Sequence, residues 1–464
     1  MLRRTPWLRA ICLLFALALV ASACGSDRED DEATEETETT EAPEEETGAA
    51  MFGDLESPCG EGEGGPAGDQ GVTADAIKIG FGDDAGYSAS PGLNHHQSDA
   101  MKAIVAWCNE QGGINGRTIE ATYYDAKITE VNNAMQRACE AEFMLVGQGF
   151  ALDAGQEETR LGCGLPSVPA WSVSPAFAHG PLMIQPVPNP VDVTPTHAAK
   201  VFQDLFPEEI KKTATMVANY AATLDTRAKT KGSYPAFGWE FLDCDVEYNI
   251  AGESDWRPFA QRLKDCGAEV VYWAGSPFPN FQNYLEAAAQ LDFNPIYQVD
   301  VNFYDEQFRD WSANGLANKV YIRTAFSPLE DRDVVPAVDQ YLTLMEESGG
   351  DPAILGMQAT SSFLLWATGV KACGAEVTRT CVIEEIGKIK GWTGGGLHAP
   401  TEPASNRPPQ CGALLKLEDG AFVRVQPEEK GEVECDPSYV AEVTGPVVDQ
   451  AKLDANRVST LFQQ

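Results

Sequence analysis

The chain has 464 residues, of which 43% are hydrophobic and 22% are charged, and its formal net charge is −37 at pH 7. So large a negative charge argues against a nucleic-acid-binding function, because the phosphate backbone demands a basic surface. About 390 residues follow an acidic N-terminal stretch, which exceeds a single usual core and predicts two lobes.

The first 24 residues have the pattern of an export signal. Three arginines precede an apolar stretch at residues 10–21 that is short for a membrane span. Small residues then lead to Cys24, and this junction resembles the lipobox of bacterial lipoproteins, although Ala21 stands where leucine is usual. The resemblance implies that Cys24 is lipidated and anchors the protein to the membrane, at the bacterial cell surface or in the periplasm. An ordinary cleavable signal is the alternative.

Residues 25–75 are predicted to form a disordered tether. Residues 25–50 contain twelve Asp or Glu and one Arg, and no apolar side chain larger than alanine. Such a segment cannot bury enough surface to offset the entropy of ordering. The stretch "GEGEGGPAGDQG" at 60–71 formally contains GxGxxG. It follows no strand and opens no helix, so we interpret it as a linker and not as a dinucleotide site.

The cysteines also indicate export. Ten remain after Cys12 and Cys24 are set aside, and no CxxC or CxxH pair suggests zinc. An oxidising exterior sustains such a set as disulfides. Sequence alone does not fix the connectivity, but short spans favour the pairs Cys139–Cys163, Cys244–Cys266, Cys373–Cys381 and Cys411–Cys435, with Cys59–Cys108 left by elimination.

From residue 76 the pattern alternates strand and helix. The strand "AIKIGFG" precedes a helix over "NHHQSDAMKAIVAWCNEQGG", and "TIEATYYD" restarts as a strand. The Gly-Gly-Ile-Asn-Gly corner at 112–116 joins the two, because glycine and asparagine accept positive φ. The alternation recurs after residue 190, three helices are expected over 333–391, and "GALLKLEDGAFVRVQ" is a hairpin. This is the signature of mostly parallel sheets covered on both faces.

Several of these stretches resemble one family. "IKIGFGDDAG" and "SDAMKAIVAWCNEQGGINGRTIEATYYDAK" look like the opening of the type I periplasmic binding proteins, in the branch of branched-chain amino-acid substrate-binding proteins. "FAQRLKDCGAEVVYWAG" resembles a helix and strand of the family's second lobe. The likeness covers roughly residues 76–430. It implies an extracytoplasmic protein that captures a small molecule and passes it to the permease and ATPase of an ABC importer.

The resemblance implies two doubly wound α/β lobes joined by a hinge of three crossings, near 187–193, 321–328 and 393–400. The N-terminal lobe would comprise 76–190 and 325–395, the C-terminal lobe 191–324 and 396–440, and the C-terminal tail 441–464. Ligands in open parallel sheets bind beyond the carboxyl ends of the strands. The candidate ligand-binding residues after these strands are Asp84, Tyr87, Phe150, Ala151, Trp171, Ser172, Tyr220, Phe278, Asp300 and Asn302.

The clamp that the family uses for an α-amino acid looks dismantled. Ala151 stands where a serine would hold the ligand carboxylate, and Thr223 stands where a tyrosine is expected. Only Asp300 remains as a partner for an ammonium group. The candidate cleft is instead rich in aromatic rings, which suit an apolar, aromatic or cationic ligand. We therefore expect a ligand other than a simple branched-chain amino acid, with an apolar or aromatic one favoured.

Two other functions compete with solute capture for import. The same two-lobed module could report a ligand to a membrane receptor without transport, or Asp84 and Asp300 could act as paired carboxylates of an enzyme. GxSxG, HExxH and P-loop patterns are absent from the sequence. The adjacent His95 and His96 diverge on a helix and make a poor chelate. We expect no catalytic residue, no metal and no cofactor.

Overall fold

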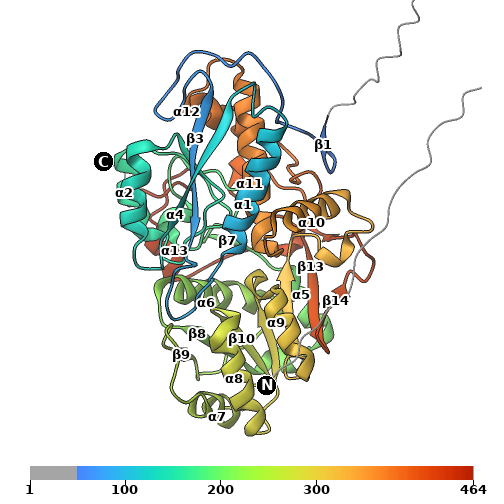
Figure 1. Ribbon diagram of the computed structural model, residues 1–464. Coiled ribbons are helices and arrows are strands. Elements are labelled where there is room, and N and C mark those ends of the chain that lie inside the picture. The colour runs from blue at the N-terminus through green and yellow to red at the C-terminus, as the bar shows by residue number, and fades with distance from the viewer. Residues whose placement is uncertain (1–49, 463–464) are drawn as a thin grey trace, which may run out of the picture. The chain divides into compact units, whose positions relative to one another are not determined.

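The computed structural model describes residues 50–462. The predicted signal peptide, the lipidation of Cys24 and the acidic residues 25–49 therefore lie outside the described residues. Residues 50–462 form an α/β fold around two main sheets (Figure 1). We call the part built on the sheet β4-β3-β5-β6 lobe 1, and the part built on the sheet β14-β13-β12-β11-β10-β8-β9 lobe 2.

Lobe 1 has a parallel four-stranded sheet with helices on both faces. Its strands are β3 (Ala76–Asp83), β4 (Thr118–Asp125), β5 (Met144–Val146) and β6 (Ser167–Val168). Its helices are α1 (His96–Glu110), α2 (Val131–Ala141), α3 (Ala154–Gly162), α4 (Pro175–Ala178), α10 (Pro336–Ser348), α11 (Ile354–Cys373) and α12 (Arg379–Gly387).

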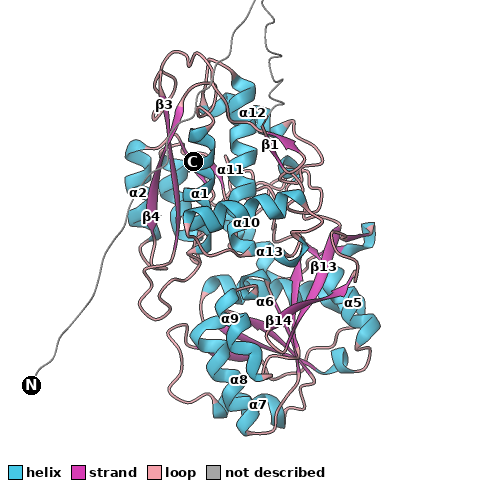
Figure 2. Cartoon of the chain, turned by 45° about the vertical axis from the view of Figure 1, so that its right-hand side comes forward, coloured by secondary structure: helices cyan, strands magenta, loops and turns pink. Residues whose placement is uncertain are grey.

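Alternate residues of β5 enter two different cores. Met144 and Val146 join the cluster that includes α1 and α11, whereas Leu145 packs with α2. This follows from the period of two along a strand. Figure 2 shows α2 on one side of β3 and β4, and α1 and α11 on the other. Fifteen residues of α11 are buried, as expected of a helix that is apolar on all sides.

Lobe 2 has an eight-stranded mixed sheet. Its strands are β8 (Thr213–Ala218), β9 (Val246–Tyr248), β10 (Val270–Ala274), β11 (Ile296–Val299), β12 (Val320–Thr324), β13 (Cys411–Glu418), β14 (Ala421–Gln426) and β15 (Glu434–Cys435). Pairing is parallel from β9 to β12 and antiparallel at β13, β14 and β15. Its helices are α5 (His197–Leu205), α6 (Ala221–Ser233), α7 (Arg257–Asp265), α8 (Gln282–Gln290) and α9 (Glu306–Trp311). The hairpin predicted at β13 and β14 is confirmed.

The chain passes between the two sheets three times, as expected. The passes follow β6, β12 and α12, and they hydrogen-bond to one another. The amide of Ala399 donates to the carbonyl of Ala325, and the amide of Ser327 donates to that of Leu397. The hydroxyl of Thr401 donates to the carbonyl of Pro186, 2.6 Å away. The crossings are thus linked to one another as well as to the lobes.

Residues 50–75 are folded, contrary to the prediction of a disordered tether. They form the hairpin of β1 (Met51–Phe52) and β2 (Leu55–Glu56) and then pack on the Gly-Gly-Ile-Asn-Gly corner. Asn115 in that corner has φ of +52°, and a Cβ on Gly62 would lie 2.5 Å from its backbone. The glycines of 60–71 therefore permit a close backbone contact. The sequence analysis interprets the same glycines as a flexible linker.

The C-terminal residues 441–462 also pack on the body. β16 (Val440–Glu442) pairs with β7 (Val193–Pro195), and α13 (Pro446–Ala451) contributes buried side chains to a small core with α4. Arg457 forms an ion pair with Asp192, with Nε 2.6 Å from Oδ2. The segment predicted as a tail is folded as far as residue 462.

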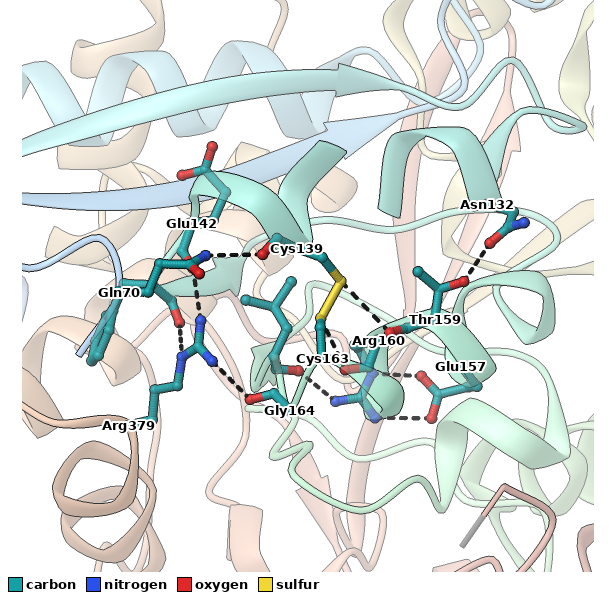
Figure 3. The surroundings of a disulfide bond; sticks show 12 residues. Gln70, Asn132, Cys139, Glu142, Glu157, Thr159, Arg160, Cys163, Gly164 and Arg379 are labelled. Atoms are coloured by element: carbon teal, nitrogen blue, oxygen red, sulfur yellow. Dashed lines mark hydrogen bonds and ion pairs between the residues drawn. A yellow bond between two sulfur atoms is a disulfide. The ribbon is translucent and has the colours of Figure 1, made fainter. Parts of the chain in front are cut away.

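The five predicted disulfides are all present: Cys59–Cys108, Cys139–Cys163, Cys244–Cys266, Cys373–Cys381 and Cys411–Cys435. Figure 3 shows the bond between Cys139 of α2 and Cys163 at the end of α3. Beside it the fully buried Arg160 makes two hydrogen bonds to Glu157, at 2.6 and 2.8 Å. The disulfide therefore joins two helices that cover one face of lobe 1.

Within residues 50–462, no helix combines the length and the apolar character that crossing a membrane requires.

Candidate functional site

A cavity of about 270 Å³ lies at the carboxyl ends of strands from both lobes. Its lobe 1 side comes from the loops after β3, β5 and β6, and its lobe 2 side from those after β8, β10 and β11, together with α6 and β12. This is where open parallel sheets place their ligands. The cavity is therefore our candidate binding site.

Seven of the ten predicted ligand-binding residues line this cavity. They are Tyr87, Ala151, Trp171, Ser172, Tyr220, Asp300 and Asn302. Their contact with a ligand stays a prediction. Trp171 reaches the cavity over the loop after β5, where a Cβ on Gly149 would lie 2.3 Å from the indole nitrogen. The glycine therefore makes room for the ring.

Asp84 does not line the cavity, contrary to our expectation. Its carboxylate is buried and accepts hydrogen bonds from the amides of Ile128 and Ala151, at 2.6 and 2.7 Å. Burial raises the pKa of Asp84 to about 6, although both hydrogen bonds oppose the rise. Asp84 thus positions the loop that carries Ala151 and has no access to a ligand.

Phe150 is a core residue. Only 2% of it is exposed, and it packs with Tyr124, Met135 and Leu165. Its neighbour Ala151, at the start of the turn before α3, lines the cavity. We assigned both residues to the cleft, and the structure places one of them there.

Phe278 also lies outside the cavity lining. Its ring packs edge-on against Phe308 of α9, with centroids 5.8 Å apart. Its backbone carbonyl accepts hydrogen bonds from the hydroxyls of Ser90 and Ser276, at 3.0 and 2.8 Å. Ser90 belongs to lobe 1, so Phe278 joins the two lobes through its backbone.

The sequence reasoning missed several aromatic residues of the cavity: Tyr234, Tyr248, Tyr272 and Phe326. Tyr248 ends β9 and stacks on Trp273, with centroids 4.7 Å apart. Its position at a strand end could have identified it. Within residues 50–462, the hydroxyl of Tyr248 and the indole nitrogen of Trp171 are buried without a hydrogen-bond partner.

Asp300 is not a free partner for an ammonium group. Its Oδ1 lies 2.5 Å from Nε of Arg323, and its Oδ2 accepts from the hydroxyl of Tyr272 at 3.2 Å. The register of β11 and β12 explains the pair, because Val299 lies opposite Ile322. Burial lowers the pKa of Arg323, but the charge of Asp300 more than offsets this and the net effect is a rise. Arg323 is a cavity residue that the sequence reasoning did not single out.

Lys229 is a second cation on the cavity lining. It lies on α6 and is 8% exposed, and its Nζ donates to Oδ1 of Asn189 at 2.7 Å. Burial and, to a smaller extent, the charge of Arg323 lower the pKa of Lys229 to about 7, although Asp300 and Asp192 oppose the shift. Nothing in the sequence separates it from Arg227 and Lys231 on the same helix.

Thr223 supports the loss of the α-amino-acid clamp. It occupies the position expected for a tyrosine, and its hydroxyl donates to the carbonyls of Ala218 and Tyr220 at 2.5 and 3.0 Å. It therefore links the first turn of α6 to the end of β8, and its proton is already engaged.

Two further clusters lie outside the cavity lining. Among residues 50–462, one group of three could hold a metal ion, namely His95, Asp99 and Asp351 at the start of α1 and after α10. Nε2 of His95 is 2.9 Å from Oδ2 of Asp351, so these two groups are already hydrogen-bonded to each other. The hydroxyl of Ser361 lies 2.8 Å from Nε2 of His398, a serine–histidine pair that we did not predict.

The serine–histidine pair belongs to the hinge. Ser361 is fully buried, and Trp392 donates to its hydroxyl at 3.0 Å. Nδ1 of His398 is 2.8 Å from the carbonyl of Ala399 in the third crossing, and burial lowers the pKa of His398 to about 4. The pair therefore fixes the crossing against α11 and does not line the cavity between the lobes.

Comparisons with known proteins agree with this geometry. Residues 76–421 match the family described as periplasmic binding protein. The comparison with curated proteins finds no similar sequence.

Solved structures share the fold at low sequence identity. An isoleucine complex of a branched-chain amino-acid transporter substrate-binding protein from Streptococcus pneumoniae is 15% identical, with a TM-score of 0.62 over 76% of this chain and 100% of that one. A fatty-acid transporter substrate-binding protein from Thermomonospora curvata is 16% identical, with a TM-score of 0.66 over 79% and 95%. A solute-binding protein from R. palustris in complex with 4-hydroxybenzoate is 18% identical, with a TM-score of 0.63 over 78% and 98%.

Proposed function

We propose that this chain, which belongs to the periplasmic binding protein family, delivers a small molecule to an ABC importer. Membership of this family implies an extracytoplasmic solute-binding protein. The observation that carries the proposal is the cavity of about 270 Å³ lined by both lobes. A ligand between hinged lobes stabilises the closed arrangement, which is the signal that a transporter can recognise. We further propose that lipidation of Cys24 holds the protein beside its permease.

The ligand is proposed to have an apolar or aromatic body. Trp171, Tyr87 and Tyr220 line the cavity, while Ala151 and Thr223 offer none of the contacts that an α-amino acid needs. Structural neighbours bind isoleucine and 4-hydroxybenzoate, and one is named for fatty acids, so the fold accommodates ligands of this size and character. Flat rings gain free energy by burial against such a body.

The test is a thermal-shift screen of a metabolite library against wild type and Trp171→Ala. A ligand should raise the melting temperature of wild type, and the variant should lose about tenfold to a hundredfold in affinity, the usual cost of removing a central aromatic contact. Trp107→Ala is the control, since Trp107 packs on Phe52 with centroids 5.6 Å apart and does not line the cavity. An unchanged response of Trp171→Ala would show that the ligand binds elsewhere.

Uptake distinguishes import from sensing. Cells lacking the protein should fail to accumulate the labelled ligand, and wild type should restore accumulation where Trp171→Ala does not. Normal uptake in the deletion strain, with an altered transcriptional response to the ligand, would instead favour a sensor that reports to a membrane receptor.

A further inference from the structure

The lobe 2 side of the cavity contains more positive than negative charge. Lys229 and Arg323 both line it, whereas Asp300 is the acidic residue of the lining. The protein as a whole has a formal net charge of −37, so a cationic cavity cannot be attributed to its general composition. Buried cations are costly unless an anion is close. One carboxylate for two cations leaves the site one negative charge short.

The other acidic groups near Lys229 are already engaged. Asp192 makes two hydrogen bonds to Arg457, at 2.6 and 2.7 Å. Asp300 is bonded to Arg323 and Tyr272. The hydrogen-bond partner of Lys229 within residues 50–462 is the neutral amide oxygen of Asn189. The ammonium group therefore has unused donors and no dedicated counter-ion.

Arg323 is in a similar state. Its Nε donates to Asp300, and within the described part of the chain no hydrogen bond is made by its two terminal nitrogens. A guanidinium presents a fork of donors that matches a carboxylate in two-point contact. Lys229 lies on α6 and Arg323 on β12, and the positive charge of Arg323 lowers the pKa of Lys229.

We infer that the ligand carries a single carboxylate group, and that Lys229 and Arg323 bind it on the lobe 2 side of the cavity while the apolar body of the ligand contacts Trp171. This inference rests on the proposed function and names the class of its ligand as monocarboxylates. The excess of one positive charge fits a monoanion better than a phosphate dianion. The carboxylate is thereby bound by lobe 2 side chains, and not at the Ala151 loop of lobe 1.

Binding should also depend on pH. The charged groups around Lys229 are Arg323, Asp300 and Asp192. The other titratable groups nearby are His179, whose pKa is lowered by burial, and the tyrosines Tyr234 and Tyr272. A carboxylate binds the charged form of Lys229 and raises its pKa in the complex. Below pH 7 the lysine is already charged and affinity is at its maximum. Above pH 7 binding must take up a proton, so affinity falls by up to about tenfold per pH unit.

The experiment uses the full-length protein and a defined set of monocarboxylates, namely benzoate, phenylacetate, hexanoate and octanoate. Each is compared with its primary amide and with the corresponding amine, by thermal shift and then by calorimetric titration at pH 6.5. At least one carboxylate should bind about tenfold or more tightly than its amide, the usual value of a hydrogen bond to a charged group. The amines should not bind.

The charge of Lys229 is tested with Lys229→Met. The variant should lose most of the preference for carboxylate over amide and all of the proton uptake measured at pH 8, while its affinity for the amide stays within about twofold. Lys231→Met is the matched control on the same helix. Lys231 pairs with Asp245 at 2.7 Å and does not line the cavity, so its preference should equal that of wild type.

The two proposals fail in different ways. Binding of amides or amines as tight as that of carboxylates would overturn the inference and leave solute binding intact. A carboxylate preference that survives in Lys229→Met would overturn the assignment of this site. If neither this set nor the metabolite library yields a ligand of any charge, the proposed function fails and the inference fails with it.

Discussion

Each lobe contains a buried ionisable side chain near the cavity or on it, and the surroundings of the two differ. Asp84 in lobe 1 accepts hydrogen bonds from two backbone amides, at 2.6 and 2.7 Å. Lys229 in lobe 2 has one neutral partner, Asn189, at 2.7 Å. Burial displaces both pKa values, raising that of Asp84 to about 6 and lowering that of Lys229 to about 7. The fold satisfies the carboxylate of Asp84, which positions a loop, whereas it leaves the ammonium group of Lys229 with one neutral partner, and this is the group that we propose binds the ligand.

The largest effect should follow from removing Arg323. Arg323→Met leaves the half-buried carboxylate of Asp300 without its cation, which should lower the free energy of unfolding by about 3 kcal/mol. The double variant Arg323→Met with Asp300→Leu should recover most of this loss, because no uncompensated charge remains. Urea unfolding of both proteins provides the measurement. Equal losses in the single and double variants would mean that the pair is not coupled as the structure shows.

Asp84→Asn should have the next largest effect. Asparagine offers one acceptor oxygen for two amide donors, so we expect a loss of about 2 kcal/mol at pH 7. The gap to wild type should widen as the pH falls from 7 towards 4. Folding raises the pKa of this carboxyl group, so its protonated form stabilises the folded state. The stabilisation is complete at pH values below the unfolded-state pKa of 3.8 and is lost as the pH rises through the folded-state pKa of about 6. A pH-independent gap would contradict burial of the charged group.

The smallest effect concerns the ligand-free protein. Lys229→Met removes a buried cation with no counter-ion and should raise the stability by about 1–2 kcal/mol at pH 6. The gain should shrink as the pH rises from 7 towards 10.5. In this range the wild-type lysine is neutral in the folded state, and the free energy spent on removing its proton during folding decreases as the pH approaches 10.5. Thermal unfolding at pH 6 and 9 measures both values. A loss of stability in the variant at pH 6 would show that Lys229 is already satisfied.

Four of the six residues predicted in lobe 1 and three of the four predicted in lobe 2 line the cavity, but the cations and several tyrosines of lobe 2 were missed. The strand–helix alternation locates the loops after β3 and β6, and Tyr87 and Trp171 do line the cavity. In the loop after β5 the alternation does not determine which side chain faces the cavity. Phe150 and Ala151 are adjacent, and which of them faces the ligand depends on a register that the pattern leaves open.

Lys229 could not be identified by any local signal. Arg227, Lys229 and Lys231 alternate along α6 and look equivalent in the sequence. The fold separates them, since Arg227 pairs with Glu247 and Lys231 with Asp245, while Lys229 turns inward. The ordered residues 50–75 were missed for a related reason. Their glycines form close contacts with a distant corner of the chain, and composition alone is equally typical of a linker.

A crystal structure of the protein with the tightest-binding monocarboxylate would test the account most directly. The account predicts the ligand between the lobes, its carboxylate within hydrogen-bond distance of Nζ of Lys229 and of the guanidinium of Arg323, and its apolar body against Trp171. A ligand whose carboxylate lies at the Ala151 loop, with Lys229 still bonded only to Asn189, would contradict it.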